Sequence, residues 1–148
     1  LFASTEIPNA VPSRGGVSRL LRIDLYNHKD SLIDLDLVFT EKQANLGTVN
    51  SAVGLGSLWT EALVKAAGFL GSYQWDASDT DVDLVNGATM STGTVSNSTG
   101  DGPAFQQMLL KADEGSTSVY VSGVLKSSTT PTYAADGIQL IFHIKYLD

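Results

Sequence analysis

Alternation of apolar and polar residues is the clearest pattern in this chain. In its best example the apolar positions are Ile33, Leu35, Leu37 and Phe39. Because successive side chains on a strand point to opposite faces, this spacing predicts a strand with one buried face. Residues 21–25 show the same alternation, and the polar residues 27–31 between the two segments predict a turn. We therefore expect the two strands to pair as an antiparallel hairpin.

The same alternation recurs toward the C-terminus. The sets expected to share an inward face are Phe69, Tyr73 and Trp75; Met108, Leu110 and Ala112; Val119, Val121 and Leu125; and Ile138, Leu140, Phe142, Ile144 and Tyr146. Residues 46–53 are a weaker strand candidate. The dipeptide Asn86-Gly87 predicts a tight hairpin, because both residues accept positive φ. The predicted core is Leu35, Leu37, Phe39, Leu140 and Phe142.

One segment has the signals of a helix, at residues 58–67. Ser57 is a candidate N-cap, Glu61 places an acid in the first turn, and Gly68 can close the end. Short strands separated by turns, with a single helix, predict an all-β fold. We expect an antiparallel β-sandwich, jelly-roll-like, of about seven or eight strands.

The two ends of the periodic region set the expected domain organisation. Residues 1–16 contain two prolines and no periodicity, so we predict an extended N-terminal arm that becomes ordered only on assembly. Residues 17–148 then form the β-sandwich domain. Residues 91–104 are rich in Ser, Thr and Gly and predict a long exposed loop.

Composition narrows the classes of function. The chain has 148 residues, about one domain, and no cysteine, so it has no disulfide and no thiolate site. Its formal charge of −7 disfavours binding to nucleic-acid phosphates. No apolar run approaches the roughly 20 residues of a membrane span.

Candidate chemistry is sparse, and we predict no catalytic, cofactor-binding or metal site. The two histidines, His28 and His143, are not spaced as zinc ligands, and no Gly-x-Ser-x-Gly elbow occurs. An acidic run at residues 76–83 has oxygen ligands suited to Ca²⁺, but solvated strand positions explain it more simply. Tyr73 and Trp75 have the spacing of a sugar platform and equally that of a core-facing strand.

Several segments resemble a known family. They are Gly15-Gly16-Val17 through to Ile33-Asp34-Leu35-Asp36-Leu37-Val38-Phe39, Ala44-Asn45-Leu46-Gly47-Thr48-Val49-Asn50, Asp83-Leu84-Val85, and Tyr120-Val121-Ser122-Gly123-Val124 to Pro131-Thr132-Tyr133. Together they resemble the small head decoration, or capsid cement, proteins of tailed bacteriophages. The motifs are patterned strands and turns spread over about residues 15–147.

The resemblance implies a structural virion protein. It implies a β-sandwich that binds the major capsid protein on the outer capsid surface as a homotrimer, after assembly in the host cytoplasm, and it transfers no catalytic residue.

Two other classes of function stay open. One is a receptor- or carbohydrate-binding module of a phage fibre, and the other is a small hydrolase that uses His28 or His143.

Overall fold

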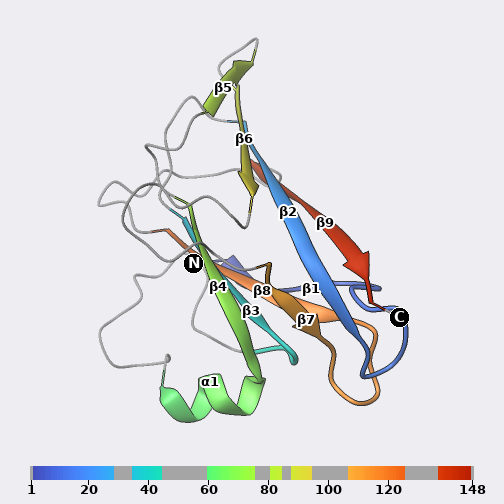
Figure 1. Cartoon of the computed structure of the whole chain (residues 1–148). Helices are drawn as coiled ribbons and strands as arrows, with labels where there is room; N and C mark the ends of the chain where they lie inside the picture. Colours follow the sequence, from blue (N-terminus) through green and yellow to red (C-terminus); the bar gives the residue numbers. More distant parts are fainter. Residues whose placement is uncertain are drawn as a thin grey trace.

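Nine strands and one helix occupy the part of the chain that the computed structural model describes, residues 2–28, 35–44, 60–75, 81–84, 88–94, 107–125 and 137–147 (Figure 1). The strands are β1 (Phe2–Ile7), β2 (Val17–Asn27), β3 (Leu35–Thr40), β4 (Phe69–Trp75), β5 (Asp81–Leu84), β6 (Ala88–Thr94), β7 (Leu109–Lys111), β8 (Val119–Leu125) and β9 (Ile138–Tyr146); the helix is α1 (Glu61–Ala67). The all-β prediction is confirmed.

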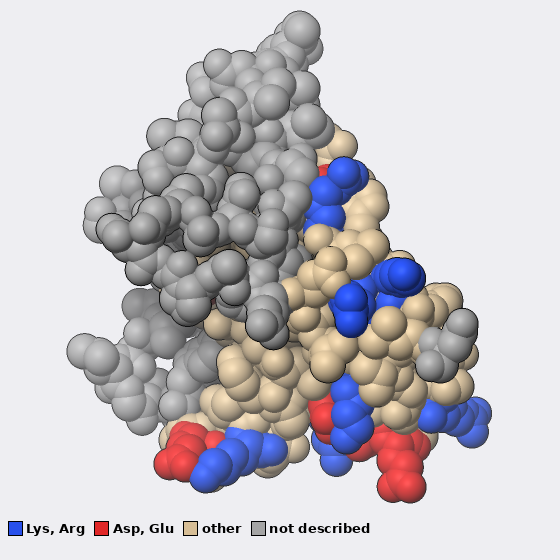
Figure 2. Space-filling view, in the orientation of Figure 1, with Lys and Arg blue, Asp and Glu red and all other residues tan. Residues whose placement is uncertain are grey.

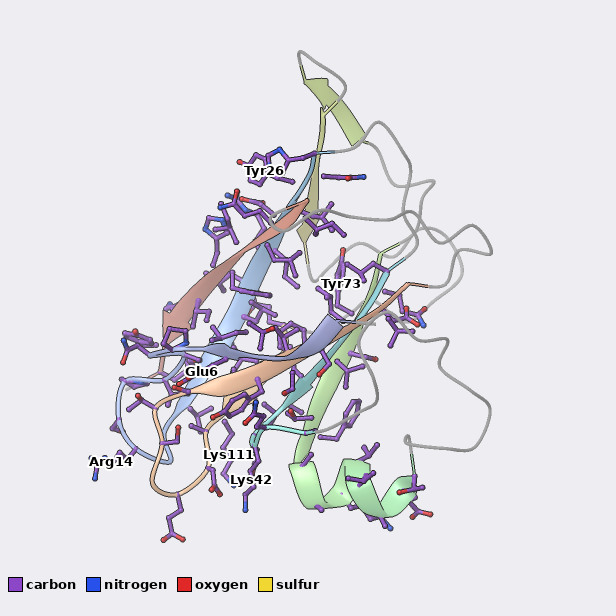
Figure 3. The ribbon with its side chains drawn as sticks, turned by 180° about the vertical axis from the view of Figure 1, so that it is seen from behind. Glu6, Arg14, Tyr26, Lys42, Tyr73 and Lys111 are labelled. Atoms are coloured by element: carbon purple, nitrogen blue, oxygen red, sulfur yellow. The ribbon has the colours of Figure 1, made fainter. Side chains whose placement is uncertain are left out.

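The strands form two antiparallel sheets. Sheet A has the order β1-β8-β3-β4. In sheet B, β5 pairs with β6, and β6 and β7 pair with different parts of β2. Strand β9 also pairs with residues 22–27 of β2, which already pair with β6, so β9 lies along the opposite side of β2. Among the described strands, β9 is therefore an edge strand, and it is the outermost ribbon of its sheet in Figures 1 and 3.

The hydrophobic core lies between the two sheets, as a β-sandwich requires. Leu35, Leu37 and Phe39 of β3 have no exposed surface, which confirms their predicted place in the core. The ring of Phe39 meets that of Phe142 from β9 edge-to-face, with 5.9 Å between centroids, so this contact joins the sheets. Leu140 and Phe142 also pack against the core but are only partly buried.

The predicted hairpin between the first two long strands is wrong. Strand β2 belongs to sheet B and β3 to sheet A. Both sides of β2 are occupied by β6, β7 and β9, and both sides of β3 are occupied by β4 and β8. Alternation identified the buried face of β3 and placed Ile23 and Leu25 of β2 correctly, but it was wrong for Leu21, which is 37% exposed because the register of β2 shifts between Leu20 and Arg22. Alternation carries no information about which strand pairs with which, so proximity in the sequence was a poor guide.

The expectation that residues 1–16 stay off their own domain also needs correction. Strand β1 pairs with β8 from Phe2↔Gly123 to Ile7↔Val119. Ala10 and Val11 are buried in the core, and the hydroxyl of Ser18 donates to the carbonyl of Ala10 over 2.5 Å. A few small apolar residues suffice here because they fill space that both sheets already enclose.

The residues on the inward face of β4 are not those that simple alternation predicts. Tyr73 is buried and lies between the sheets (Figure 3), but Phe69 is 51% exposed. The register shifts between the pairs Phe39↔Gly71 and Thr40↔Phe69, which places one extra residue in β4. A bulge of this kind exchanges the faces of the residues on its two sides, so Leu70 packs on the core in place of Phe69.

Helix α1 begins three residues later than predicted. The N-cap is Thr60, whose hydroxyl accepts from the N–H of Leu63, rather than Ser57. Gly68 ends the helix with φ of 68°, as predicted. A side chain at this position would meet Glu41 within 2.9 Å, a second reason for glycine.

The remaining expectations are met in part. Strands β5 and β6 pair antiparallel on either side of Asn86-Gly87, although the turn itself lies outside the described residues. Residues 91–94 belong to β6, so this part of the predicted loop 91–104 is strand. Residues 46–53 and 95–104, together with the start of the acidic run at 76–80, lie outside the described residues.

Candidate functional site

The outer face of sheet B carries a group of basic side chains along β2 and β9. They are Arg19, Arg22, His143 and Lys145, and we call them the basic stripe. In the sheet register Arg22 lies opposite His143, and Arg19 lies opposite Lys145. Figure 2 shows Lys and Arg side chains over this region, whereas most of the visible Asp and Glu side chains lie near α1 and the β7–β8 connection. The net charge of the chain is −7, so the basic stripe is a positively charged surface on a protein that is negatively charged as a whole.

Asp24 is the acid within the stripe, and it is only 7% exposed. Burial by itself raises the pKa of this carboxyl. The hydrogen bond from His143 and the charge of Arg22 outweigh that effect, so the pKa of Asp24 lies below its usual value. Asp24 is therefore a carboxylate near neutral pH.

The contacts of His143 define its hydrogen-bonding role. Its Nε2 lies 2.8 Å from Oδ2 of Asp24 and 3.0 Å from Nη2 of Arg22. Arginine only donates, and its Nη2 also lies 3.0 Å from Oδ2 of Asp24. We assign the proton to Nε2, because Oδ2 then accepts from both neighbours. His143 of β9 and Arg22 of β2 thus both donate to Asp24 of β2. The hydrogen bond from His143 connects β9 to β2.

Arg19 and Lys145 differ from this group, whose charges are paired. Arg19 Nη1 donates to Oε1 of Gln107 over 2.8 Å, and its Nε is buried with no hydrogen-bond partner. Among the described residues, no carboxylate forms an ion pair with either cation. Like charges directly opposite each other in a sheet are unfavourable. Two other lysines, Lys42 and Lys111, lie together near α1 (Figure 3) and pair with Asp113 and Glu41.

Strand β9 presents its outer edge beside the stripe. Leu147 N–H donates to the carbonyl of Val17, and Gly137 accepts from the N–H of His28. Residues 137 and 147 therefore direct backbone groups toward β2. Since β9 pairs without interruption on its own side, the even-numbered residues 138–146 direct their N–H and C=O groups away from β2.

Side chains along this edge are only partly covered. Leu20, Ile23 and Leu25 of β2 are at most 1% exposed, whereas Leu140, Phe142 and Ile144 of β9 are partly buried. On the outer face Ile141 is 39% exposed. An apolar strand edge next to unpaired cations can bind another polypeptide through backbone hydrogen bonds, apolar contact and charge together.

The structure separates the candidate residues considered from sequence. His28 is exposed at the end of β2, far along that strand from His143 in the middle of β9. Tyr73 is 8% exposed and belongs to the core, whereas the side chain of Trp75 lies outside the described part. The basic stripe was missed because its two halves, on β2 and on β9, lie more than a hundred residues apart in the sequence, and a cluster formed across strands leaves no local motif.

Metal sites and membrane-spanning helices are two other features that the described residues could contain. No group of three or more His, Asp or Glu side chains is close enough there to hold a metal ion. No helix in that part is long and apolar enough to cross a membrane.

Comparison with family models, with curated proteins and with solved structures finds no match for this chain.

Proposed function

We propose that this chain is a structural virion protein that binds the outer surface of a tailed-phage capsid and stabilises it as a decoration, or cement, protein. The observation that carries the proposal is the β9 edge beside the basic stripe, an interaction surface on a β-sandwich. The resemblance of residues 15–147 to phage head decoration proteins names the partner, the major capsid protein.

The charge distribution supports an external position. A chain with a net charge of −7 is repelled by the packed DNA that faces the inner capsid wall. A cement protein acts by mass action, because it binds the assembled shell and not the separate subunits. The affinities of many modest contacts then combine through multivalency, and a homotrimer would offer three equivalent contact sites to the capsid.

The alternative, a carbohydrate- or receptor-binding module, loses part of its support. An aromatic platform needs exposed rings, and Tyr73 is buried between the sheets. The hydrolase hypothesis requires a histidine joined to both a carboxylate and a serine. His143 contacts the carboxylate of Asp24, but within the described residues no hydroxyl is hydrogen-bonded to it.

The proposal is tested by density for the particle that contains this chain, compared with particles made without it. We expect trimeric knobs on the outer shell and an earlier loss of shell integrity on heating when the protein is missing. Density at a tail tip, or along the inner wall, would refute the proposal. Light scattering of the isolated protein gives its oligomeric state before assembly.

A further inference from the structure

We propose that the β9 edge binds an extended segment of a partner protein in which apolar and acidic residues alternate, so that the segment adds a strand to sheet B. This inference deepens the proposed function, since the segment would belong to the capsid shell. Its chemistry follows from the edge alone. It does not depend on which particle the chain decorates.

The backbone of β9 supplies the first part of the argument. Even-numbered residues from Ile138 to Tyr146 direct their N–H and C=O groups to the side of the strand away from β2, where no described strand pairs with them. Natural edge strands are usually protected by proline, a bulge, an inward-pointing charge or exposed charges such as lysine. Of these, β9 has only its outer-face charge at Lys145, and the side chains it packs against the core are Ile138, Leu140, Phe142 and Ile144. An edge this long and apolar is suited to strand addition.

The two faces of β9 determine which segment fits. On the inner face, Leu140, Phe142 and Ile144 are only partly buried, so apolar side chains of an added strand would complete the cover of the core. On the outer face, an added strand would place its side chains next to His143 and Lys145. Acidic residues there would neutralise Lys145, which has no carboxylate partner among the described residues. Arg19 lies one strand further away on β2 and would add to the positive potential of this face.

Charge also argues against a second copy of this chain as the occupant. Antiparallel pairing of β9 with β9 of another copy would bring two basic stripes side by side. That arrangement adds like charges to a face on which Arg19 and Lys145 already oppose each other. An acidic segment removes this repulsion, and a second copy increases it.

The test uses a blocked synthetic peptide of alternating valine and glutamate, about seven residues long, the usual length of a strand. Fluorescence anisotropy would measure its binding at low salt, and NMR would follow the backbone amides of β9. We expect binding, with slower hydrogen exchange at Leu140, Phe142 and Ile144. A peptide with lysine in place of glutamate should bind at least about tenfold more weakly, because it meets the stripe with like charge.

Charge reversal provides the matched variants. Lys145→Glu should weaken binding of the glutamate peptide about tenfold and improve binding of the lysine peptide. Lys65→Glu makes the same change of charge on α1, remote from β9 (Figure 1), and should leave both affinities almost unchanged. If the two variants changed the peptide affinities equally, the effect would come from the net charge of the protein. That result would overturn the assignment of peptide binding to the β9 edge.

Other outcomes separate this inference from the proposed function. No binding of the glutamate peptide, or unchanged exchange of the β9 amides, overturns the strand-addition site. Dimers in sedimentation with protected β9 amides and no peptide would assign the edge to a second copy. If wild-type protein and Lys145→Glu bind particles equally, the edge proposal fails and the decoration function stands. If the peptide binds and the particles do not, the function fails and the edge proposal stands.

Discussion

Two outermost strands, β1 in sheet A and β9 in sheet B, differ in apolar content and in burial. Strand β1 belongs to a segment with few apolar residues, yet Ile7, Ala10 and Val11 are almost fully buried. Strand β9 is far more apolar, yet its inward side chains are only partly buried. The comparison shows that burial depends on position relative to both sheets and only weakly on the apolar content of the segment.

Contacts from the segment that follows β1 explain part of this difference. Val11 N–H donates to the carbonyl of Thr117, and Ser18 binds the carbonyl of Ala10, so residues 8–18 fold back over one end of the core. Along β9 the described contacts of this kind come from its last residue, where Tyr146 donates to the carbonyl of Asn9. The segment after β1 is therefore held against the core by several contacts, whereas β9 makes fewer contacts of this kind with the described residues.

Deleting residues 1–11 should lower the free energy of unfolding more than any other change proposed for the two edges. The deletion removes β1 and the buried side chains of Ile7 and Val11, and we expect the free energy of unfolding to fall by about 4–8 kcal/mol. Urea denaturation followed by circular dichroism measures the change. A shortened protein that unfolds at the wild-type midpoint would show that β1 is a dispensable arm.

A cross-strand pair of leucines offers a matched comparison between the centre and the edge of sheet B. Leu25 and Leu140 lie opposite each other, and Leu25 is 1% exposed while Leu140 is only partly buried. Leu25→Ala should cost about 2–5 kcal/mol, and Leu140→Ala roughly half as much. Equal losses in urea denaturation would mean that the edge is packed as tightly as the centre.

Replacing the carboxylate of the basic stripe tests what fixes β9 to β2. Asp24→Asn removes a charged acceptor of two hydrogen bonds and should cost about 1.5–3 kcal/mol at neutral pH. Because the pKa of Asp24 is lowered by folding, the wild-type advantage is complete above the unfolded carboxyl pKa of about 3.9 and is lost as pH falls through the lower folded-state pKa.

Urea midpoints of both proteins between neutral pH and pH of about 2 would check this sign. The gap between wild type and Asp24→Asn should narrow below pH of about 4. A gap of constant size over the whole range would mean that ionisation of Asp24 contributes nothing to the attachment of β9.

The smallest effect should come from the hydroxyl that links the two edges. Tyr146→Phe removes the hydrogen bond of 2.8 Å to the carbonyl of Asn9 and keeps the ring. Since Tyr146 is 49% exposed, water can replace the lost donor, and we expect a loss of about 0.5–1 kcal/mol at most. Hydrogen exchange of the amides near both residues would report local loosening. A larger global loss would mean that the two edges form one cooperative unit.

Local patterns predicted the elements of this protein better than their arrangement. Alternation found the inward faces of β3, β7 and β8, and the glycine signal found the end of α1 at Gly68. It misplaced Phe69, because a one-residue bulge in β4 arises from pairing with β3 and leaves no trace in the spacing of side chains. The basic stripe was equally invisible, since Arg19 and Lys145 meet only through the β2–β9 register.

By itself, then, the sequence determined the all-β class, the buried face of most strands and the single short helix, because these depend on side-chain period and on caps a few residues apart. The tertiary structure decided that β2 and β3 lie in different sheets, that Ile7, Ala10 and Val11 belong to the core and that β9 is the outermost described strand beside β2. Those outcomes depend on contacts between segments that can lie more than a hundred residues apart, where the free energy of packing and backbone pairing selects one partner among many with the same pattern.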